Sequence, residues 1–262
     1  MPLWGRWLLA GLGLLVSGAL SAQPMRCGVV LLHGKWGTAQ SPFLQPVVQI
    51  LEPHCQVRML EMPWSRNRLY DRPYADALEQ IRVEVARLRA AGVQWVAVGG
   101  QSFGANATLA YMAQVGDADA VMPMAPGHVP EVFYQLPDVR RSVDLAHQSI
   151  AAGLGDDLVE MTDINQGQRR TVRPSATALW SYFNPQGWGN MAQSAKSFRR
   201  AVPVFWAIGT QDMLYGEASL KIYKQLPLHP DSHYLVVNAT HATTPQVARQ
   251  PLLDWVLART ER

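Results

Sequence analysis

Three residues of this sequence have side chains that together could carry out acyl transfer. They are Ser102 in the pentapeptide G-Q-S-F-G (residues 100–104), Asp212 at the end of G-T-Q-D, and His241 in the segment A-T-H-A. A serine hydroxyl attacks a carbonyl carbon when an imidazole removes its proton and a carboxylate fixes the tautomer of that imidazole. Ser102, His241 and Asp212 are therefore the candidates for such a set.

Each of the three residues comes just after an apolar stretch with the pattern of a buried strand. The stretches span residues 93–99, 202–208 and 234–237. Short continuous apolar runs are typical of strands that are covered on both faces of a parallel sheet. Because such sheets assemble their sites at the carboxyl ends of the strands, the three side chains are expected to meet at one edge.

The pentapeptide around Ser102 has the form G-x-S-x-G, between a predicted strand and a predicted helix over residues 105–115. In a nucleophile elbow the serine adopts a strained turn, and the flanking glycines let helix and strand approach closely. The backbone N–H of Phe103, at the start of the helix, would then face a developing oxyanion. The alternative is an ordinary turn that carries a surface serine.

The rest of the chain alternates strands with helices, as in a parallel α/β sheet. Further strands are predicted over residues 28–32, 56–60 and 119–124, and helices over 41–52, 74–88, 217–225 and 245–260. Thr243 and Thr244 have hydroxyls placed to cap the last helix. We therefore expect helices on both faces of the sheet.

These motifs resemble those of the α/β-hydrolase superfamily, and more narrowly those of small exported bacterial hydrolases. The resemblance covers the chain from Gly28 to about Arg259. It implies the α/β-hydrolase fold and a Ser-His-Asp triad that works through an acyl-enzyme. In that triad Ser102 would be the nucleophile, His241 the general base and then acid, and Asp212 the residue that orients His241. No room remains for the two strands that usually precede the first strand found here, so the sheet should be a reduced, mainly parallel one of about six strands with a cap insertion.

A second oxyanion donor is implied by His33 and Gly34, which directly follow the first predicted strand. They resemble the oxyanion loop of the same superfamily, in which a backbone N–H just after the glycine points at the substrate carbonyl oxygen. Lys35 or Trp36 would provide that N–H here, and His33 would orient the loop rather than carry a proton. The alternative is a plain glycine-rich turn.

Two other residues compete for the roles of base and acid. His128 also follows a strand end, and Glu217 lies near Asp212 in the chain. The order of acid then base favours His241 over His128, and the position directly after a strand favours Asp212 over Glu217. The other histidines before or between elements are interpreted as surface or structural groups: His54, His147, His229 and His233.

Residues 129–200 interrupt the alternation and are interpreted as a cap over Ser102 rather than an independent domain. A helix is predicted over residues 138–154 and a hairpin around residues 165–168. Aromatic side chains are candidates for lining the substrate pocket: Trp36, Trp180, Tyr182, Phe183 and Trp188. The alternative for those of the cap is that they hold it on the core.

The first 22 residues have the order of a secretory signal peptide: Arg6, an apolar run over residues 7–20, and small residues at Ser21 and Ala22. Cleavage after Ala22 would leave a single domain of residues 23–262 in the periplasm or outside the cell, without a membrane anchor. An uncleaved anchor is the alternative, although the run is shorter than the roughly 20 residues that a membrane span needs.

The sequence has two cysteines, Cys27 and Cys55, each just before a predicted strand. The starts of neighbouring parallel strands lie about 5 Å apart, which is within reach of a disulfide. Because an exported chain meets an oxidising compartment, a Cys27–Cys55 disulfide is predicted. Two buried free thiols are the alternative.

Composition narrows the classes of partner. Without Arg6 the chain has 22 Lys and Arg against 20 Asp and Glu, and no Lys/Arg cluster alternates with aromatic residues, so nucleic acid is not an expected partner. The sequence has no phosphate loop, nicotinamide fingerprint or metal-ligand spacing, and no cofactor or metal is implied. The leading hypothesis is an exported hydrolase of a small carboxylic ester. The alternatives are an amidase, peptidase or acyltransferase with the same triad, and a catalytically silent binding module.

Overall fold

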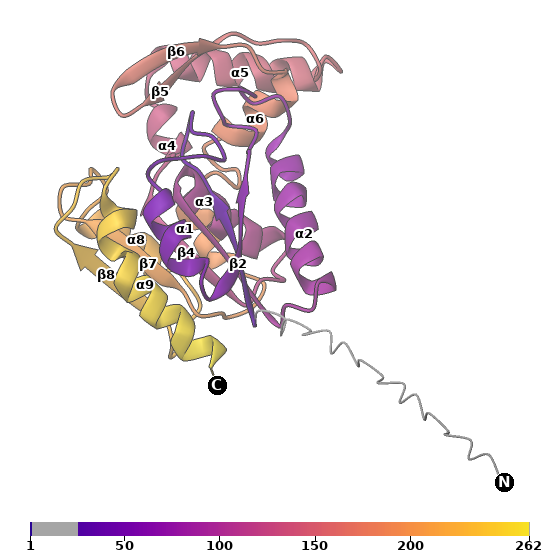
Figure 1. Cartoon of the computed structure of the whole chain (residues 1–262). Helices are drawn as coiled ribbons and strands as arrows, with labels where there is room; N and C mark the ends of the chain where they lie inside the picture. The colour runs from indigo at the N-terminus through magenta and orange to yellow at the C-terminus, as the bar shows by residue number, and fades with distance from the viewer. Residues whose placement is uncertain (2–25, 262) are drawn as a thin grey trace.

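The structure is a computed structural model that describes Met1 and residues 26–261. The proposed signal peptide, residues 1–22, lies outside the described residues except for Met1. The described chain forms a central sheet, a small second sheet, and helices on both sides of the central sheet (Figure 1).

The central sheet has six strands, and every pair of neighbours is parallel. In chain order the strands are β1 (Cys27–Leu32), β2 (Cys55–Leu60), β3 (Trp95–Ser102), β4 (Ala120–Pro126), β7 (Phe205–Gly209) and β8 (His233–Val237). Their order across the sheet is β2-β1-β3-β4-β7-β8. The predicted reduced parallel sheet is therefore confirmed.

β1 shows why the apolar runs become central strands. All six of its residues are buried, and successive side chains point to opposite faces of the sheet. Val29 and Leu31 pack in the hydrophobic core on one face, whereas Val30 and Leu32 pack in the core on the other. Because both faces are covered, the strand lacks the polar alternation of a half-exposed one.

Helices cover both faces of the sheet (Figure 1). α1 (Gln45–Leu51) and α9 (Thr244–Thr260) pack against each other on one face. α2 (Tyr74–Ala90), α3 (Phe103–Gln114) and α8 (Glu217–Tyr223) lie on the other. None of the helices in the described chain is long and apolar enough to cross a membrane.

The chain between β4 and β7 forms a long segment, residues 127–204, which we call the insertion. It contains α4 (Pro130–Phe133), α5 (Pro137–Ala151), β5 (Met161–Asn165), β6 (Gln168–Val172), α6 (Ala176–Phe183) and α7 (Met191–Lys196). Its helix α5 and its hairpin lie beyond the end at which the central strands finish (Figure 1). The predicted hairpin is confirmed: β5 and β6 are antiparallel, and Gln166 and Gly167 form a two-residue turn with φ of 48° and 77°.

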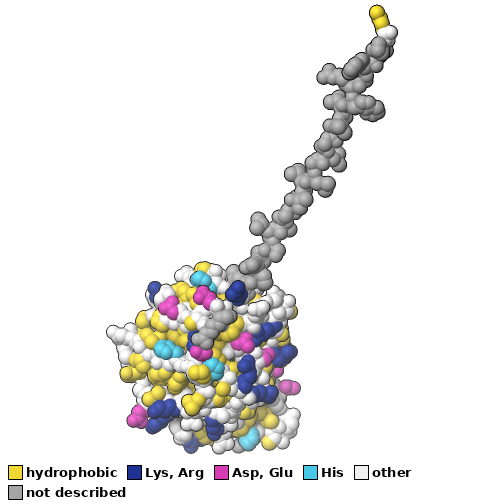
Figure 2. All heavy atoms as spheres, turned by 90° about the horizontal axis from the view of Figure 1, so that it is seen from below, with side chains coloured by type: hydrophobic (Ala, Val, Ile, Leu, Met, Phe, Trp, Pro, Cys, Tyr) yellow, Lys and Arg dark blue, Asp and Glu magenta, His cyan; other side chains and the backbone are white. Residues whose placement is uncertain are grey.

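A disulfide joins Cys27, at the start of β1, to Cys55, at the start of β2, and the two Cα atoms are 4.7 Å apart. The two residues are direct partners in the parallel ladder. The predicted disulfide is therefore confirmed. It lies at the end of the sheet opposite the insertion, the end seen in Figure 2, where acidic and basic side chains are interspersed.

Candidate active site

Ser102 ends β3 and immediately precedes α3, in a conformation that few non-glycine residues adopt. Its φ is 58° and its ψ is −118°. The flanking positions must be glycine because any side chain there would clash with the backbone. A Cβ on Gly104 would lie 2.0 Å from the carbonyl oxygen of Leu32, and one on Gly100 would lie 2.4 Å from the carbonyl carbon of Gly104. The segment therefore has the tight strand-to-helix turn that the sequence predicts, with Ser102 at its apex.

Asp212 and His241 follow the neighbouring strands β7 and β8 and are hydrogen-bonded to each other. His241 Nδ1 lies 2.6 Å from Asp212 Oδ2, and Asp212 Oδ1 accepts the backbone N–H of Leu214 at 2.9 Å. Because Nδ1 donates to the carboxylate, Nε2 of a neutral His241 is left as an acceptor. Nε2 is buried and has no hydrogen-bond partner among the described residues.

Ser102 and His241 face the same small space beside Gly127. A Cβ added to Gly127 would lie 2.9 Å from Ser102 Oγ and 3.4 Å from His241 Cε1. Both residues also line the same two cavities, and Asp212 lines one of them. The structure thus brings the three predicted residues together at the carboxyl edge of the sheet.

Hydroxyl groups fix the turn that carries His241. Thr243 Oγ1 accepts the backbone N–H of Thr240 at 3.0 Å, and Thr244 Oγ1 donates to the carbonyl oxygen of Thr240 at 2.8 Å. The expectation that these hydroxyls cap α9 is wrong, since its N-terminus has no side-chain cap. They close the preceding turn instead, which holds His241 next to Asp212.

Two of the three proposed oxyanion donors remain available. Within the described chain, the backbone N–H groups of Phe103 and Lys35 have no hydrogen-bond partner. The N–H of Trp36 donates to the carbonyl oxygen of Trp64 at 2.9 Å. The prediction of Trp36 as an alternative oxyanion donor is therefore wrong, because its N–H is already hydrogen-bonded to the loop after β2.

His33 orients the loop that carries Lys35. Its Nε2 accepts the backbone N–H of Met62 at 3.0 Å, so its Nδ1 donates to the carbonyl oxygen of Gly34 at 2.8 Å. Trp64 Nε1 donates to the carbonyl oxygen of His33 at 2.8 Å. Burial lowers the pKa of His33, which keeps the ring neutral in this role. These contacts agree with the predicted loop-orienting role.

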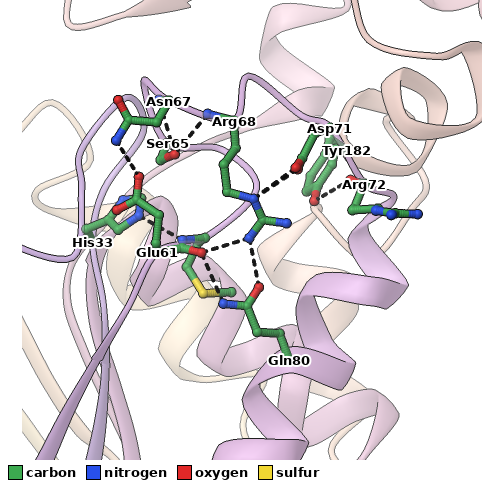
Figure 3. Close-up of polar contacts among 10 residues, drawn as sticks. His33, Glu61, Ser65, Asn67, Arg68, Asp71, Arg72, Gln80 and Tyr182 are labelled. Atoms are coloured by element: carbon green, nitrogen blue, oxygen red, sulfur yellow. Dashed lines mark hydrogen bonds and ion pairs between the residues drawn. The ribbon is translucent and has the colours of Figure 1, made fainter.

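The loop after β2, residues 61–72, supports this arrangement. The sequence predicts an irregular loop over residues 61–67 at this edge of the sheet, but it indicates no role for it. Arg68 Nη1 donates to the carbonyl oxygen of Glu61 at 2.8 Å and to Gln80 Oε1 at 2.9 Å, and its Nε bonds Asp71 (Figure 3). Gln80 Nε2 also donates to the Glu61 carbonyl, at 3.0 Å. The Arg68 guanidinium thus connects the two ends of the loop, at Glu61 and Asp71, and joins the loop to α2 through Gln80.

Asp163 of β5 is the centre of a buried cluster that joins the insertion to the oxyanion loop. Its Oδ1 accepts Lys35 Nζ at 2.6 Å and the N–H of Ile164 at 2.9 Å. Its Oδ2 accepts Trp36 Nε1 at 2.8 Å and the Tyr70 hydroxyl at 2.6 Å. Burial lowers the pKa of Lys35 and raises that of Tyr70, so the carboxylate and its ammonium partner form a desolvated pair.

The aromatic pocket candidates of the insertion lie away from Ser102. Tyr182 and Phe183 are buried and pack on the Tyr70 ring at centroid distances of 5.1 and 5.5 Å. Trp180 and Trp188 line a separate cavity of about 500 Å³ beside α2, which Ser102 does not line. The contacts therefore favour the alternative interpretation for Tyr182 and Phe183, in which they hold the insertion on the core.

Two cavities of about 110 Å³ each adjoin Ser102. Both are lined by Lys35, Ser102, Asn165, Gln166 and His241. The first continues past Gly34, Phe43 and Gln101, and the second past His128, Phe133 and Leu214. Asn165 and Gln166 belong to the end of the hairpin, so the insertion contributes directly to the space around the serine.

His128, the competing base, is held in a different role. Its Nε2 donates to the carbonyl oxygen of Tyr182 at 2.8 Å, and its ring stacks on Phe103 at 3.8 Å. Burial, together with the Lys35 charge, holds the pKa of His128 well below 6.5. Glu217, the competing acid, is exposed and pairs with Lys221 at 2.9 Å. The paired imidazole and carboxylate are those of His241 and Asp212.

The low pKa of His128 predicts a loss of stability in acid. As the pH falls through 6.5 the unfolded chain binds a proton at this residue while the folded chain does not, so unfolding becomes easier. Each pH unit over which only the unfolded chain is protonated costs about 1.4 kcal/mol. Urea denaturation on both sides of this range should show a shallower acid loss for His128→Gln than for the native chain. Equal pH dependence in the two proteins would contradict the assignment.

No family model matches the chain, and no curated protein matches it either. Solved structures do. Est1E from Butyrivibrio proteoclasticus, with ferulic acid bound, has a TM-score of 0.66 and 16% identity over 92% of each chain. A monoacylglycerol lipase from Paleococcus ferrophilus has a TM-score of 0.65 and 17% identity over 90% of this chain and 95% of that one.

A structure of the metagenome-derived lipolytic enzymes LipS and LipT has a TM-score of 0.61 and 14% identity, covering 91% of this chain and 94% of that one. These matches show that the chain has the α/β-hydrolase fold, and that its structural neighbours include esterases and lipases.

Proposed function

We propose that this chain is a serine hydrolase that cleaves carboxylic esters through an acyl-enzyme. The observation that carries the proposal is the hydrogen bond of 2.6 Å between His241 Nδ1 and Asp212 Oδ2, with the Nε2 of His241 unpaired and the His241 ring and Ser102 Oγ both next to Gly127. A carboxylate on one side of an imidazole and a serine on the other form the set that ester hydrolysis requires.

Acylation follows from these positions. Nε2 of His241 takes the hydroxyl proton as Ser102 Oγ attacks the ester carbonyl, and Asp212 stabilises the imidazolium. The negative charge on the carbonyl oxygen is met by the backbone N–H groups of Phe103 and Lys35. When the intermediate collapses, the alcohol oxygen takes the proton from Nε2 and leaves. Water then repeats the sequence on the acyl-enzyme and releases the acid.

The cavities beside Ser102 are small, with volumes of about 110 Å³ each. The first adjoins a larger groove of about 420 Å³. We therefore expect short acyl and alcohol groups to fit within the cavities, and a longer group on one side of the ester to extend into the groove. The esterase and lipase names of the structural neighbours support ester chemistry in general.

Activity-based labelling tests the proposal directly. A fluorophosphonate probe should label the protein, and Ser102→Ala should abolish the labelling, because the hydroxyl is the group that the probe phosphonylates. A panel of matched short-chain esters and amides then separates esterase from amidase activity. Labelling that persists in Ser102→Ala would remove this residue from the mechanism. No labelling and no turnover in the native protein would favour the silent binding module.

We also propose that the protein works in the periplasm or outside the cell. The disulfide between Cys27 and Cys55 supports this location, because disulfides persist in oxidising compartments. The order of basic, apolar and small residues over positions 1–22 supports it as well.

A further inference from the structure

A groove of about 420 Å³ continues from the serine cavity toward solvent. The groove adjoins the first cavity beside Ser102, because the two share five lining residues: Lys35, Gly37, Ser41, Phe43 and Asn165. Beyond these, the groove is lined by Trp36, Arg66 and Arg170, among others. One wall therefore comes from the core and the other from the hairpin of the insertion.

The backbone fixes the side from which each arginine enters the groove. In β6, Gln168 and Arg170 line the groove and Arg169 does not, as the alternation of a strand requires. Arg66 is held by its own backbone N–H, which donates to the carbonyl oxygen of Gly37 at 3.2 Å, and by its Nε, which donates to the carbonyl oxygen of Trp36 at 3.2 Å.

Neither guanidinium is neutralised by the protein. Within residues 26–261, no carboxylate forms an ion pair with Arg66 or Arg170. Asp163 is the residue directly opposite Arg170 in the hairpin ladder, and its Oδ1 forms an ion pair with Lys35 Nζ at 2.6 Å. Among the described residues, the groove thus carries two positive charges that no carboxylate pairs with.

We propose that this groove binds an anionic group of the substrate, such as a carboxylate, placed some bonds away from the ester that Ser102 attacks. Guanidinium groups bind carboxylates through paired, charge-assisted hydrogen bonds, and two that converge on one groove discriminate against neutral groups. This inference rests on the proposed function, and names the chemical class of its substrate.

Pairs of esters that differ in one charge test the inference. For an anion on the acyl side, the 4-nitrophenyl hemiesters of succinate, glutarate and adipate are compared with 4-nitrophenyl butyrate. For an anion on the alcohol side, 3-acetoxybenzoate is compared with phenyl acetate. We expect at least one anionic ester to have a kcat/KM about tenfold or more above that of its neutral partner, as a charged hydrogen bond allows.

The ratio of anionic to neutral kcat/KM is the readout for the variants. Arg66→Gln and Arg170→Gln should each lower this ratio by about tenfold, and Arg170→Lys should restore part of it. Arg169→Gln is the matched control, because it removes the same charge from the next residue of the strand, and it should keep the ratio.

Two results would overturn the inference while leaving the ester hydrolase intact. One is turnover of the neutral esters with no preference for any anionic ester, and the other is a preference that survives in the Arg66→Gln/Arg170→Gln double variant. The absence of both turnover and Ser102 labelling would instead overturn the proposed function, and the inference with it.

Discussion

Replacing His241 by alanine is expected to lower kcat/KM for a short-chain ester by about 10⁴- to 10⁶-fold, because nucleophile and base act as a unit. The buried Nε2 of His241 has no partner among the described residues, so it is free to take the Ser102 proton. The measurement is steady-state hydrolysis of 4-nitrophenyl acetate, with circular dichroism to show that the variant is folded.

Asp212→Asn should lower the rate by about 10⁴-fold, since an amide at this position would favour the wrong imidazole tautomer. Glu217→Gln is the matched control for the acid, because its carboxylate is exposed and pairs only with Lys221 among the described residues. His54→Ala, an exposed histidine before β2, is the control for the base. If either control variant lost as much activity as its counterpart, the assignment of roles would be wrong.

Asp163→Ala is expected to lower the free energy of unfolding by about 3–5 kcal/mol, because it leaves the Lys35 ammonium buried without its partner. The Trp36 and Tyr70 side chains lose their acceptor in the same variant. Urea denaturation measures the effect. Activity should fall as well, because the same side chains hold the loop that presents the Lys35 N–H to the oxyanion.

A second variant separates the buried charge from a general loss of packing. Lys35→Met/Asp163→Leu removes both charges and should recover much of the lost stability, as replacement of buried ion pairs by apolar residues often does. Asp138→Asn is the control on an exposed ion pair of 3.6 Å and should cost less than about 1 kcal/mol. The interpretation fails if the double variant is no more stable than Asp163→Ala.

Local patterns predicted the fold, and they singled out the three residues that the structure brings together in the candidate site. The apolar runs before Ser102, Asp212 and His241 become strands of one parallel sheet, and their ends lie at the same edge because all strands of such a sheet run in one direction. Glycine is required on both sides of Ser102 because a Cβ there would clash with residues a few positions away or with the neighbouring strand β1. Such local steric requirements appear directly in the sequence as a motif.

Contacts between distant segments leave no such pattern. Lys35 and Asp163 are 128 positions apart, and nothing next to Asp163 in the sequence marks it as the partner of the oxyanion loop. The sequence also does not show that the N–H of Trp36 is used. Its acceptor, the carbonyl oxygen of Trp64, lies on a separate loop whose course depends on contacts such as that of Arg68 with Gln80. The one local signal was Asp163 itself, a carboxylate in the middle of the short strand β5.

The aromatic residues of the insertion illustrate the same limit. Their types indicate burial or binding, but only the packing of α6 against α2 decides which. Tyr182 lies among the rings of Tyr70 and Tyr74, whereas Trp180 stacks on His147 of α5. Tyr182 and Trp180, two positions apart in the sequence, thus lie in the core and beside a cavity, respectively.

The disulfide between the starts of β1 and β2 lies at the opposite pole of the molecule from the serine. Arg26 directly precedes β1, so a carrier or resin coupled at Arg26 would lie at that pole, away from the hairpin of the insertion (Figure 1). Immobilisation through this side should preserve access for substrates, whereas coupling through the hairpin tip should block it.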